Sequence, residues 1–132
     1  MAHRTFPKPE PRERFKARRK RQEAALVQEV RPQVLARDGP CRLRRVRLFG
    51  PCDGVPEWAH FGESQRWRTR GLPPQERHTI EGSLMLCTWH HELYDGRRYR
   101  GGHRMRITAL TERRCAGPLR YQLGETVYEE AA

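Results

Sequence analysis

The densest group of metal-ligating side chains in the sequence has the spacing Cys-x2-His-His-x3-Asp and is formed by Cys87, His90, His91 and Asp95. Cys87 and His90 can hold one ion across a tight turn. His91 and Asp95 are four residues apart, so on a helix they share one face and can hold a second ion. The pattern therefore predicts two neighbouring metal sites.

The first site needs two further ligands, and Cys41 and Cys52 can supply them. A Cys3His set with Cys87 and His90 suits structural zinc, which takes four sulfur or nitrogen ligands and displaces the thiol protons. Ten residues separate Cys41 from Cys52, so a ribbon or hairpin must bring them together. The alternatives are two ordinary buried cysteines or a Cys41–Cys52 disulfide. Cys115 is predicted to be a small core residue, although it could replace one of the ligands.

His60 makes the second site a candidate for catalysis. It lies in the strand-like run 57–61, about thirty residues before His91 and Asp95. An imidazole with a pKa of about 6.5 can take a proton from water at neutral pH. A divalent ion held by imidazole and carboxylate can polarise a phosphodiester and stabilise the leaving oxygen. These are the two requirements of phosphodiester hydrolysis with a single metal ion. Alone, such a histidine is usually structural.

The composition favours a nucleic-acid partner. The chain has 132 residues and a formal net charge of +11, with arginine as the main basic residue. Its planar guanidinium suits phosphate, and nucleic acid fits this charge better than an acidic membrane surface does. Only 36% of the residues are hydrophobic, so a structural metal would help a small core. Oligomeric state cannot be derived from these features.

No apolar run approaches the roughly 18 residues of a membrane span, and no secretory signal is visible at the N-terminus. We therefore expect no membrane partner and a cytoplasmic, nucleic-acid-associated protein. In that compartment the four cysteines are expected to be reduced or metal-bound rather than paired as disulfides.

The chain divides into three predicted stretches. Residues 1–35 form a basic N-terminal arm and helix, residues 36–98 a compact core, and residues 99–132 a short C-terminal β extension. The predicted helices span about 12–29, 32–38 and 89–94, with Pro32 starting the second and Gly96 stopping the third. The predicted strands span about 55–61, 83–86, 105–110 and 119–123.

Two basic segments are candidates for contacts with a phosphate backbone. One is the cluster in the N-terminal helix, which comprises Lys16, Arg18, Arg19, Lys20 and Arg21. The other is the loop that alternates Arg66, Arg68 and Arg70 with Trp67, whose ring could stack on bases. The alternative for the first is a solvated helix whose last turns dock on the core. For the second, it is a charged loop with Trp67 in the core.

Three motifs together resemble the HNH endonuclease family and its ββα-metal (His-Me finger) fold. They are Arg37-Asp38-Gly39-Pro40-Cys41, Ala59-His60 and Leu86-Cys87-x2-His90-His91-x3-Asp95. The resemblance covers about residues 36–96, and the last motif is the most specific of the three. Among HNH proteins, the chain is most similar to the small zinc-bearing ones of phages and prophages. The fold class that it implies is α+β.

The resemblance implies a role for each matching residue. His60 would be the general base that activates water, and His91 and Asp95 would hold the catalytic divalent ion, which could be Mg, Mn, Ni or Zn. Cys41, Cys52, Cys87 and His90 would form a separate structural zinc site. Enzymes of this family hydrolyse DNA, and cleavage leaves a 5′-phosphate and a 3′-hydroxyl. A bacterial or phage-infected cell would be the setting.

The sequence departs from the family pattern at two positions. Ala59 stands where relatives often carry a metal-binding Asp or His; Glu57, on the same strand face, could compensate. Ser83 follows Gly82 where the family's Asn is expected, and its hydroxyl could partly take over the orientation of His60. These departures leave two functions open, namely a DNA endonuclease and a zinc-stabilised nucleic-acid-binding module that has lost cleavage. A basic RNA-associated zinc protein is less favoured.

Overall fold

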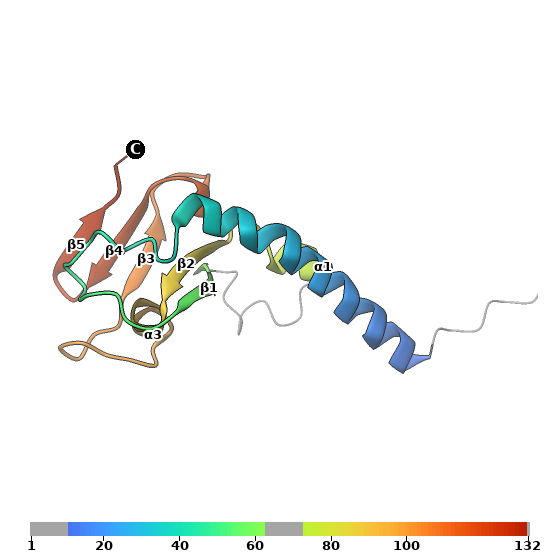
Figure 1. Cartoon of the computed structure of the whole chain (residues 1–132). Coiled ribbons are helices and arrows are strands. Elements are labelled where there is room, and N and C mark those ends of the chain that lie inside the picture. Colours follow the sequence, from blue (N-terminus) through green and yellow to red (C-terminus); the bar gives the residue numbers. More distant parts are fainter. Residues whose placement is uncertain (1–10, 63–72, 132) are drawn as a thin grey trace, which may run out of the picture.

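The computed structural model describes residues 11–62 and 73–131, which form an α+β fold (Figure 1). A long N-terminal helix precedes two small antiparallel sheets and several short helices, and the predicted α+β class is confirmed. The helices are α1 (Arg12–Asp38), α2 (Pro74–Arg77), α3 (Thr88–Asp95) and the 3-10 helix η2 (Arg114–Ala116). The strands are β1 (Pro56–His60), β2 (Ser83–Cys87), β3 (Arg106–Ala109), β4 (Leu119–Leu123) and β5 (Thr126–Glu129).

Helix α1 is continuous through Pro32, so the prediction of two separate helices is wrong. A proline inside a helix removes one backbone hydrogen bond, which costs about 3 kcal/mol in an exposed helix. Here Val30 and Val34, on either side of Pro32, are buried against Met85 of β2. This packing holds the helix together across the proline. The helix ends as predicted at Gly39, whose φ of 75° suits glycine and whose N–H donates to the carbonyl of Leu35.

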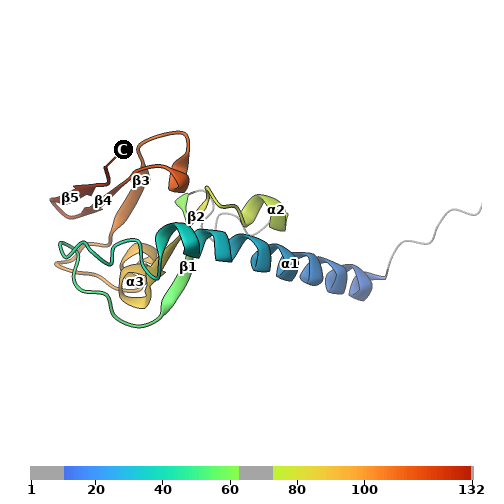
Figure 2. The same cartoon turned by 45° about the horizontal axis from the view of Figure 1, so that its top comes forward.

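The first half of α1 projects from the body of the protein (Figures 1 and 2). Every side chain from residue 11 to residue 22 is exposed, although several of them line a small cavity together with residues 73–75. None of the helices in the described part of the chain combines the length and apolar character that a bilayer crossing requires.

Strands β1 and β2 form the two-stranded sheet, and α3 follows β2 without a loop. The register pairs Pro56 with Cys87 at one end and His60 with Ser83 at the other. Cys87 caps α3, since its sulfur accepts from the backbone N–H of His90, and Gly96 ends the helix with a φ of 85°. The predicted strand, strand and helix are thus confirmed in order and position.

The segment between Cys41 and Cys52 consists of turns, so the prediction of a ribbon or hairpin is wrong. Two successive turns are closed by hydrogen bonds from Arg44 to Cys41 and from Val46 to Leu43. Leu43 and Phe49 are completely buried. The alternation of apolar and basic residues here comes from turns that alternately face the core and the solvent.

The three-stranded sheet β3-β4-β5 closes the other side of the core. Strands β3 and β4 were predicted, whereas β5 was not. Met105, Leu119 and Tyr121 share one buried cluster with Leu43 and Phe49. The C-terminal stretch therefore contributes to the same core as the segment that follows α1, while the three-part division of the chain stays a prediction.

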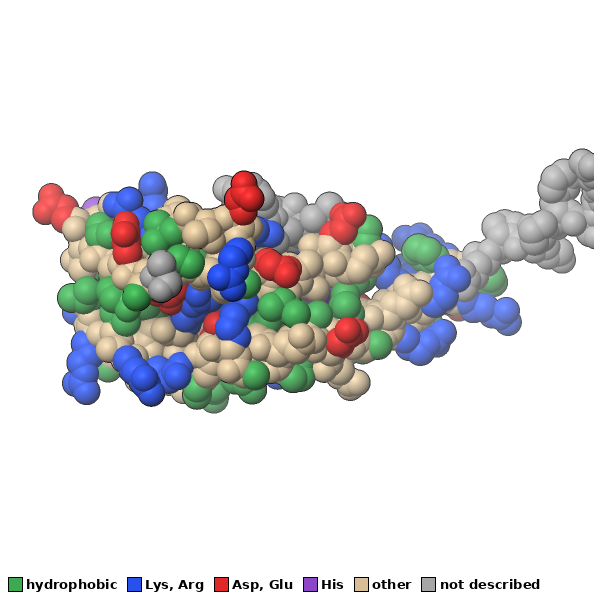
Figure 3. Space-filling view, turned by 90° about the horizontal axis from the view of Figure 1, so that it is seen from above, with side chains coloured by type: hydrophobic (Ala, Val, Ile, Leu, Met, Phe, Trp, Pro, Cys, Tyr) green, Lys and Arg blue, Asp and Glu red, His purple; other side chains and the backbone are tan. Residues whose placement is uncertain are grey.

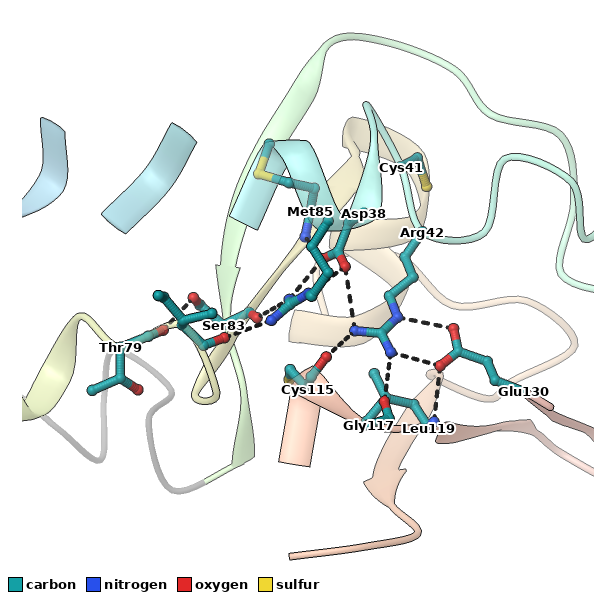
Figure 4. A network of polar contacts seen from close by, with 12 residues as sticks. Asp38, Cys41, Arg42, Thr79, Ser83, Met85, Cys115, Gly117, Leu119 and Glu130 are labelled. Atoms are coloured by element: carbon teal, nitrogen blue, oxygen red, sulfur yellow. Dashed lines mark hydrogen bonds and ion pairs between the residues drawn. The ribbon is translucent and has the colours of Figure 1, made fainter. Parts of the chain in front are cut away.

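A network of charged groups ties these parts together (Figure 4). Arg42 donates to both carboxylate oxygens of Glu130, at 2.7 and 2.9 Å, and to the carbonyls of Cys115 and Gly117. Asp38, at the end of α1, contacts Arg42 and accepts from the backbone N–H of Met85 at 2.9 Å. The turn that carries Cys41 is thereby fixed to α1, to β2 and to the C-terminal sheet.

Candidate metal centre and adjoining cavity

Cys41, Cys52, Cys87 and His90 lie around one point, with all four ligand atoms within 4.8 Å of one another. The sulfurs of Cys87, Cys41 and Cys52 lie 3.1, 3.4 and 3.7 Å from Nδ1 of His90. An ideal tetrahedral zinc would separate sulfur from nitrogen by about 3.5 Å. The donor set and its spacing therefore fit a structural zinc ion. All four cysteines are free thiols, so the alternative of a Cys41–Cys52 disulfide does not hold.

The surroundings of His90 support metal binding through Nδ1. Its other ring nitrogen, Nε2, lies 3.0 Å from the carbonyl of Gly50, which can only accept. The proton is therefore held on Nε2, and Nδ1 presents its lone pair to the three sulfurs. Burial lowers the pKa of His90, which favours the same neutral ring.

Burial also affects the thiols, because a charged thiolate is disfavoured away from water. It raises the pKa of Cys41 to about 12 and also raises the pKa of Cys52. A divalent cation at this point would supply the positive charge that lets these thiols ionise. Cys115, which is completely buried, lies outside the group, as its predicted role in the core requires.

Residues of α3 also line a cavity of about 870 Å³. Its lining includes His60, His91 and Asp95, three of the four residues predicted for phosphodiester chemistry, but not the fourth, Ser83. Glu57 and Arg97 also line it. The register of β1 with β2 and the direct β2–α3 connection place these residues on neighbouring elements.

His91 lies between two carboxylates, one of which contacts its ring at hydrogen-bond distance. Nδ1 lies 2.7 Å from Glu57 Oε1, and Nε2 lies 3.9 Å from Asp95 Oδ2. Asp95 Oδ2 also accepts from Arg97 Nε at 2.6 Å. Hydrogen bonds from Thr88 and His91 outweigh burial and hold the pKa of Glu57 below its usual value, so the carboxylate is ionised. Nδ1 of His91 then carries the proton, and Nε2 is left to bind an ion together with Asp95.

His60 contacts a histidine that lies outside all the sequence motifs. His60 Nε2 lies 2.9 Å from Nδ1 of His78, and His78 Nε2 lies 2.8 Å from Glu23 Oε1 on α1. His78 is 6% exposed, and its ring also stacks on Trp58. Since α2 has only four residues and Glu23 lies on the distant α1, no local periodicity could have indicated this chain of contacts.

The two positions that depart from the family pattern, Ala59 and Ser83, are both buried. The Ala59 side chain is completely buried in the core. Ser83 is also buried; its hydroxyl donates to the carbonyl of Thr79 at 2.6 Å, while its backbone pairs with His60 across the sheet. The role of Ser83 beside His60 stays a prediction.

Of the predicted DNA-contacting residues, those on α1 are described and those of the loop are not. Lys and Arg side chains surround the projecting end of α1 (Figure 3). All five members of the predicted cluster are exposed there, namely Lys16, Arg18, Arg19, Lys20 and Arg21. Arg66, Arg68 and Arg70 lie outside the described residues.

Fold and site together define a small α+β protein with a Cys3His cluster suited to zinc. Comparison with protein-family models, with curated proteins and with solved structures gives no match.

Proposed function

We propose that the protein is a metal-dependent DNA endonuclease of the HNH type, with a structural zinc beside the catalytic cavity. The order β1, β2, α3 supports this proposal, because two antiparallel strands followed directly by a helix are the elements of a ββα-metal core. The zinc ligands Cys87 and His90 lie at the start of that helix and would hold its orientation relative to the preceding strands.

One observation carries the proposal: His60, His91 and Asp95 line the same cavity, although 34 residues separate the first from the last. In this cavity His91 Nε2 and Asp95 offer two ligands to a divalent ion. When bound, such an ion would polarise the scissile phosphate and stabilise the leaving oxygen. Glu57 keeps the ring of His91 in the protonation state that binding requires.

The chain's own groups would perform the remaining steps. His60 would take a proton from a water molecule as its oxygen attacks phosphorus. Arg97 and Arg104 line the cavity and can bind the nonbridging phosphate oxygens, where negative charge is concentrated. Arg97 pairs with Asp95 in this structure, so a divalent ion on Asp95 would release its guanidinium toward the phosphate.

The arm of α1 would bind the backbone of duplex DNA at a distance from the cut. Its five exposed basic residues lie on the part of the helix that projects from the body. Each phosphate that such a residue neutralises releases counterions, which gives binding that depends on salt but not on sequence.

The alternative is a zinc-stabilised nucleic-acid-binding module of the same fold. It is favoured by the buried Ala59, which supplies no ligand, and by the Ser83 hydroxyl, which is directed at Thr79. The arm and the zinc site would serve such a module equally well.

Plasmid nicking separates the two functions. Zinc-loaded protein should nick supercoiled DNA when Mg²⁺, Mn²⁺ or Ni²⁺ is added, and His60→Ala should remove nicking while DNA affinity stays unchanged. The exposed His103 offers the matched control, since His103→Ala should nick at the normal rate. Binding without nicking under all three ions would favour the module, and equal nicking by His60→Ala would remove His60 from the mechanism.

A further inference from the structure

We propose that His78 and Glu23 are positioning residues that select which ring nitrogen of His60 accepts the proton. The inference rests on the proposed function for its consequence in catalysis. Its structural part concerns only three side chains that contact one another in series. Glu23 lies on α1, His78 immediately follows α2, and His60 ends β1.

The Glu23 carboxylate at the end of the series determines which atom donates and which accepts in each hydrogen bond. Glu23 is a carboxylate and can only accept, so His78 Nε2, at 2.8 Å, must carry its proton toward it. A neutral imidazole has one proton, which leaves Nδ1 of His78 as an acceptor. His60 Nε2 lies 2.9 Å from that atom and therefore donates to it. The lone pair of His60 is then on Nδ1, and this is the atom that would take a proton from water.

Arg77 is the group that could oppose this assignment. Its NH2 group lies 3.2 Å from His78 Nε2 and also pairs with Glu23. Arg77 can donate to the Glu23 carboxylate instead of to His78. A deprotonated Nε2 would place its lone pair against a lone pair of the Glu23 oxygen at 2.8 Å, and the two would repel each other. The shorter contact with Glu23 therefore decides the position of the proton.

Burial makes the arrangement rigid. His78 is 6% exposed; its ring stacks on Trp58, and its Nε2 contacts Glu23 and Arg77. The centroid of the His60 ring lies 5.1 Å from those of both Trp58 and His78. In the HNH pattern an Asn orients the base, and this chain has Ser83 at that position. His78 and Glu23 supply, from outside the motif, the orientation that the pattern assigns to the Asn.

The experiment combines ring NMR with cleavage kinetics. Protein labelled with ¹⁵N-histidine and loaded with zinc is studied at mildly alkaline pH, and the His60 signals are assigned with His60→Gln. The wild type should show His60 protonated on Nε2. His78→Ala and Glu23→Gln should shift the signals toward the other tautomer or a mixture, and kcat should fall roughly tenfold or more with KM and DNA affinity unchanged.

Glu29→Gln is the matched control, because Glu29 is an exposed acid on the same helix. It should change neither the ring signals nor kcat. A wild-type His60 protonated on Nδ1, or signals and kcat that stay unchanged in both variants, would overturn the proposal. If the wild type does not cleave DNA, the proposed function fails, and the ring signals alone still decide whether His78 and Glu23 orient His60. Zinc content and circular dichroism show that each variant is folded.

Discussion

Glu57 Oε1 lies 2.7 Å from Nδ1 of His91, and the opposite ring nitrogen faces Asp95. A carboxylate behind a ligating histidine fixes the ring and raises its basicity, and its loss typically weakens metal binding about 10- to 100-fold. We expect Glu57→Ala to weaken Mn²⁺ binding by this factor, as measured by calorimetric titration of zinc-loaded protein. Glu92→Ala, on the same helix but paired with Arg98, should leave the affinity unchanged. Equal affinity of Glu57→Ala and wild type would contradict the arrangement.

Removal of zinc should destabilise the fold, because the ion would join the turn after α1 to β2 and α3. Binding energies of structural zinc are large, so a chelator should lower Tm by at least about 10 °C. Cys87→Ser should lose the metal, whereas Cys115→Ala should retain one zinc per chain by elemental analysis, since Cys115 lies outside the cluster. An unchanged melting curve after chelation, with no metal in the purified protein, would eliminate the site.

Glu130 should contribute far more to stability than its neighbour Glu129. Its carboxylate accepts from Arg42, Tyr121 and the backbone of Leu119, and Glu130→Ala leaves Arg42 with a poorly paired charge. We expect a loss of roughly 3 kcal/mol in the free energy of unfolding. Glu129→Ala breaks only an exposed pair with Arg120 and should cost at most about 0.5 kcal/mol. Urea denaturation distinguishes the two, and similar losses would argue against the network.

Stability should fall with acidification, in part through His78. Burial, together with Arg77, lowers the pKa of His78 from its ordinary value of 6.5. His78 therefore binds a proton less readily in the folded state than in the unfolded chain. Its contribution to the free energy of unfolding is complete above pH 6.5 and is lost as the pH falls through the lowered pKa. In urea titrations of zinc-saturated protein, the free energy of unfolding should decrease less steeply with falling pH in His78→Gln than in the wild type. The exposed substitution His103→Gln should leave this pH dependence unchanged. Identical pH profiles would mean that His78 does not titrate in this way.

The basic cluster on α1 should set the salt dependence of DNA binding. Replacement of Lys16, Arg18, Arg19, Lys20 and Arg21 by alanine keeps a helix-forming sequence and removes five exposed charges. The slope of log Kobs against log salt should decrease by roughly 0.9 for each phosphate that the variant no longer neutralises. Arg113→Ala, an exposed substitution on the body, should change it little. A slope that the fivefold variant shares with the wild type would show that the arm does not bind DNA.

Sequence reasoning succeeded where the relevant contacts are local. Cys87 and His90 are three residues apart across a helix start, and Gly96 ends that helix, so both features follow from short-range geometry. The meeting of Cys41 and Cys52 with that pair was predicted from ligand chemistry alone. The backbone between them was predicted wrongly, because turns and a hairpin can both join two cysteines and residue types do not distinguish them.

Contacts between distant residues could not be predicted in this way. Glu23 and His78 are 55 residues apart, and nothing in their immediate neighbours marks either as a partner of the other. Glu130, which follows β5, lies 88 residues from its partner Arg42. Strand β5 was missed because its residues are mostly exposed and carry no apolar alternation.

The central claim is that His60 faces a divalent ion held by His91 and Asp95. An anomalous difference map from crystals of the zinc-loaded protein soaked in Mn²⁺ tests it most directly. The predicted result is a manganese peak bonded to Nε2 of His91 and a carboxylate oxygen of Asp95, on the side of the cavity that His60 lines. No peak at these ligands, or a His60 ring turned away from the ion, would contradict the account.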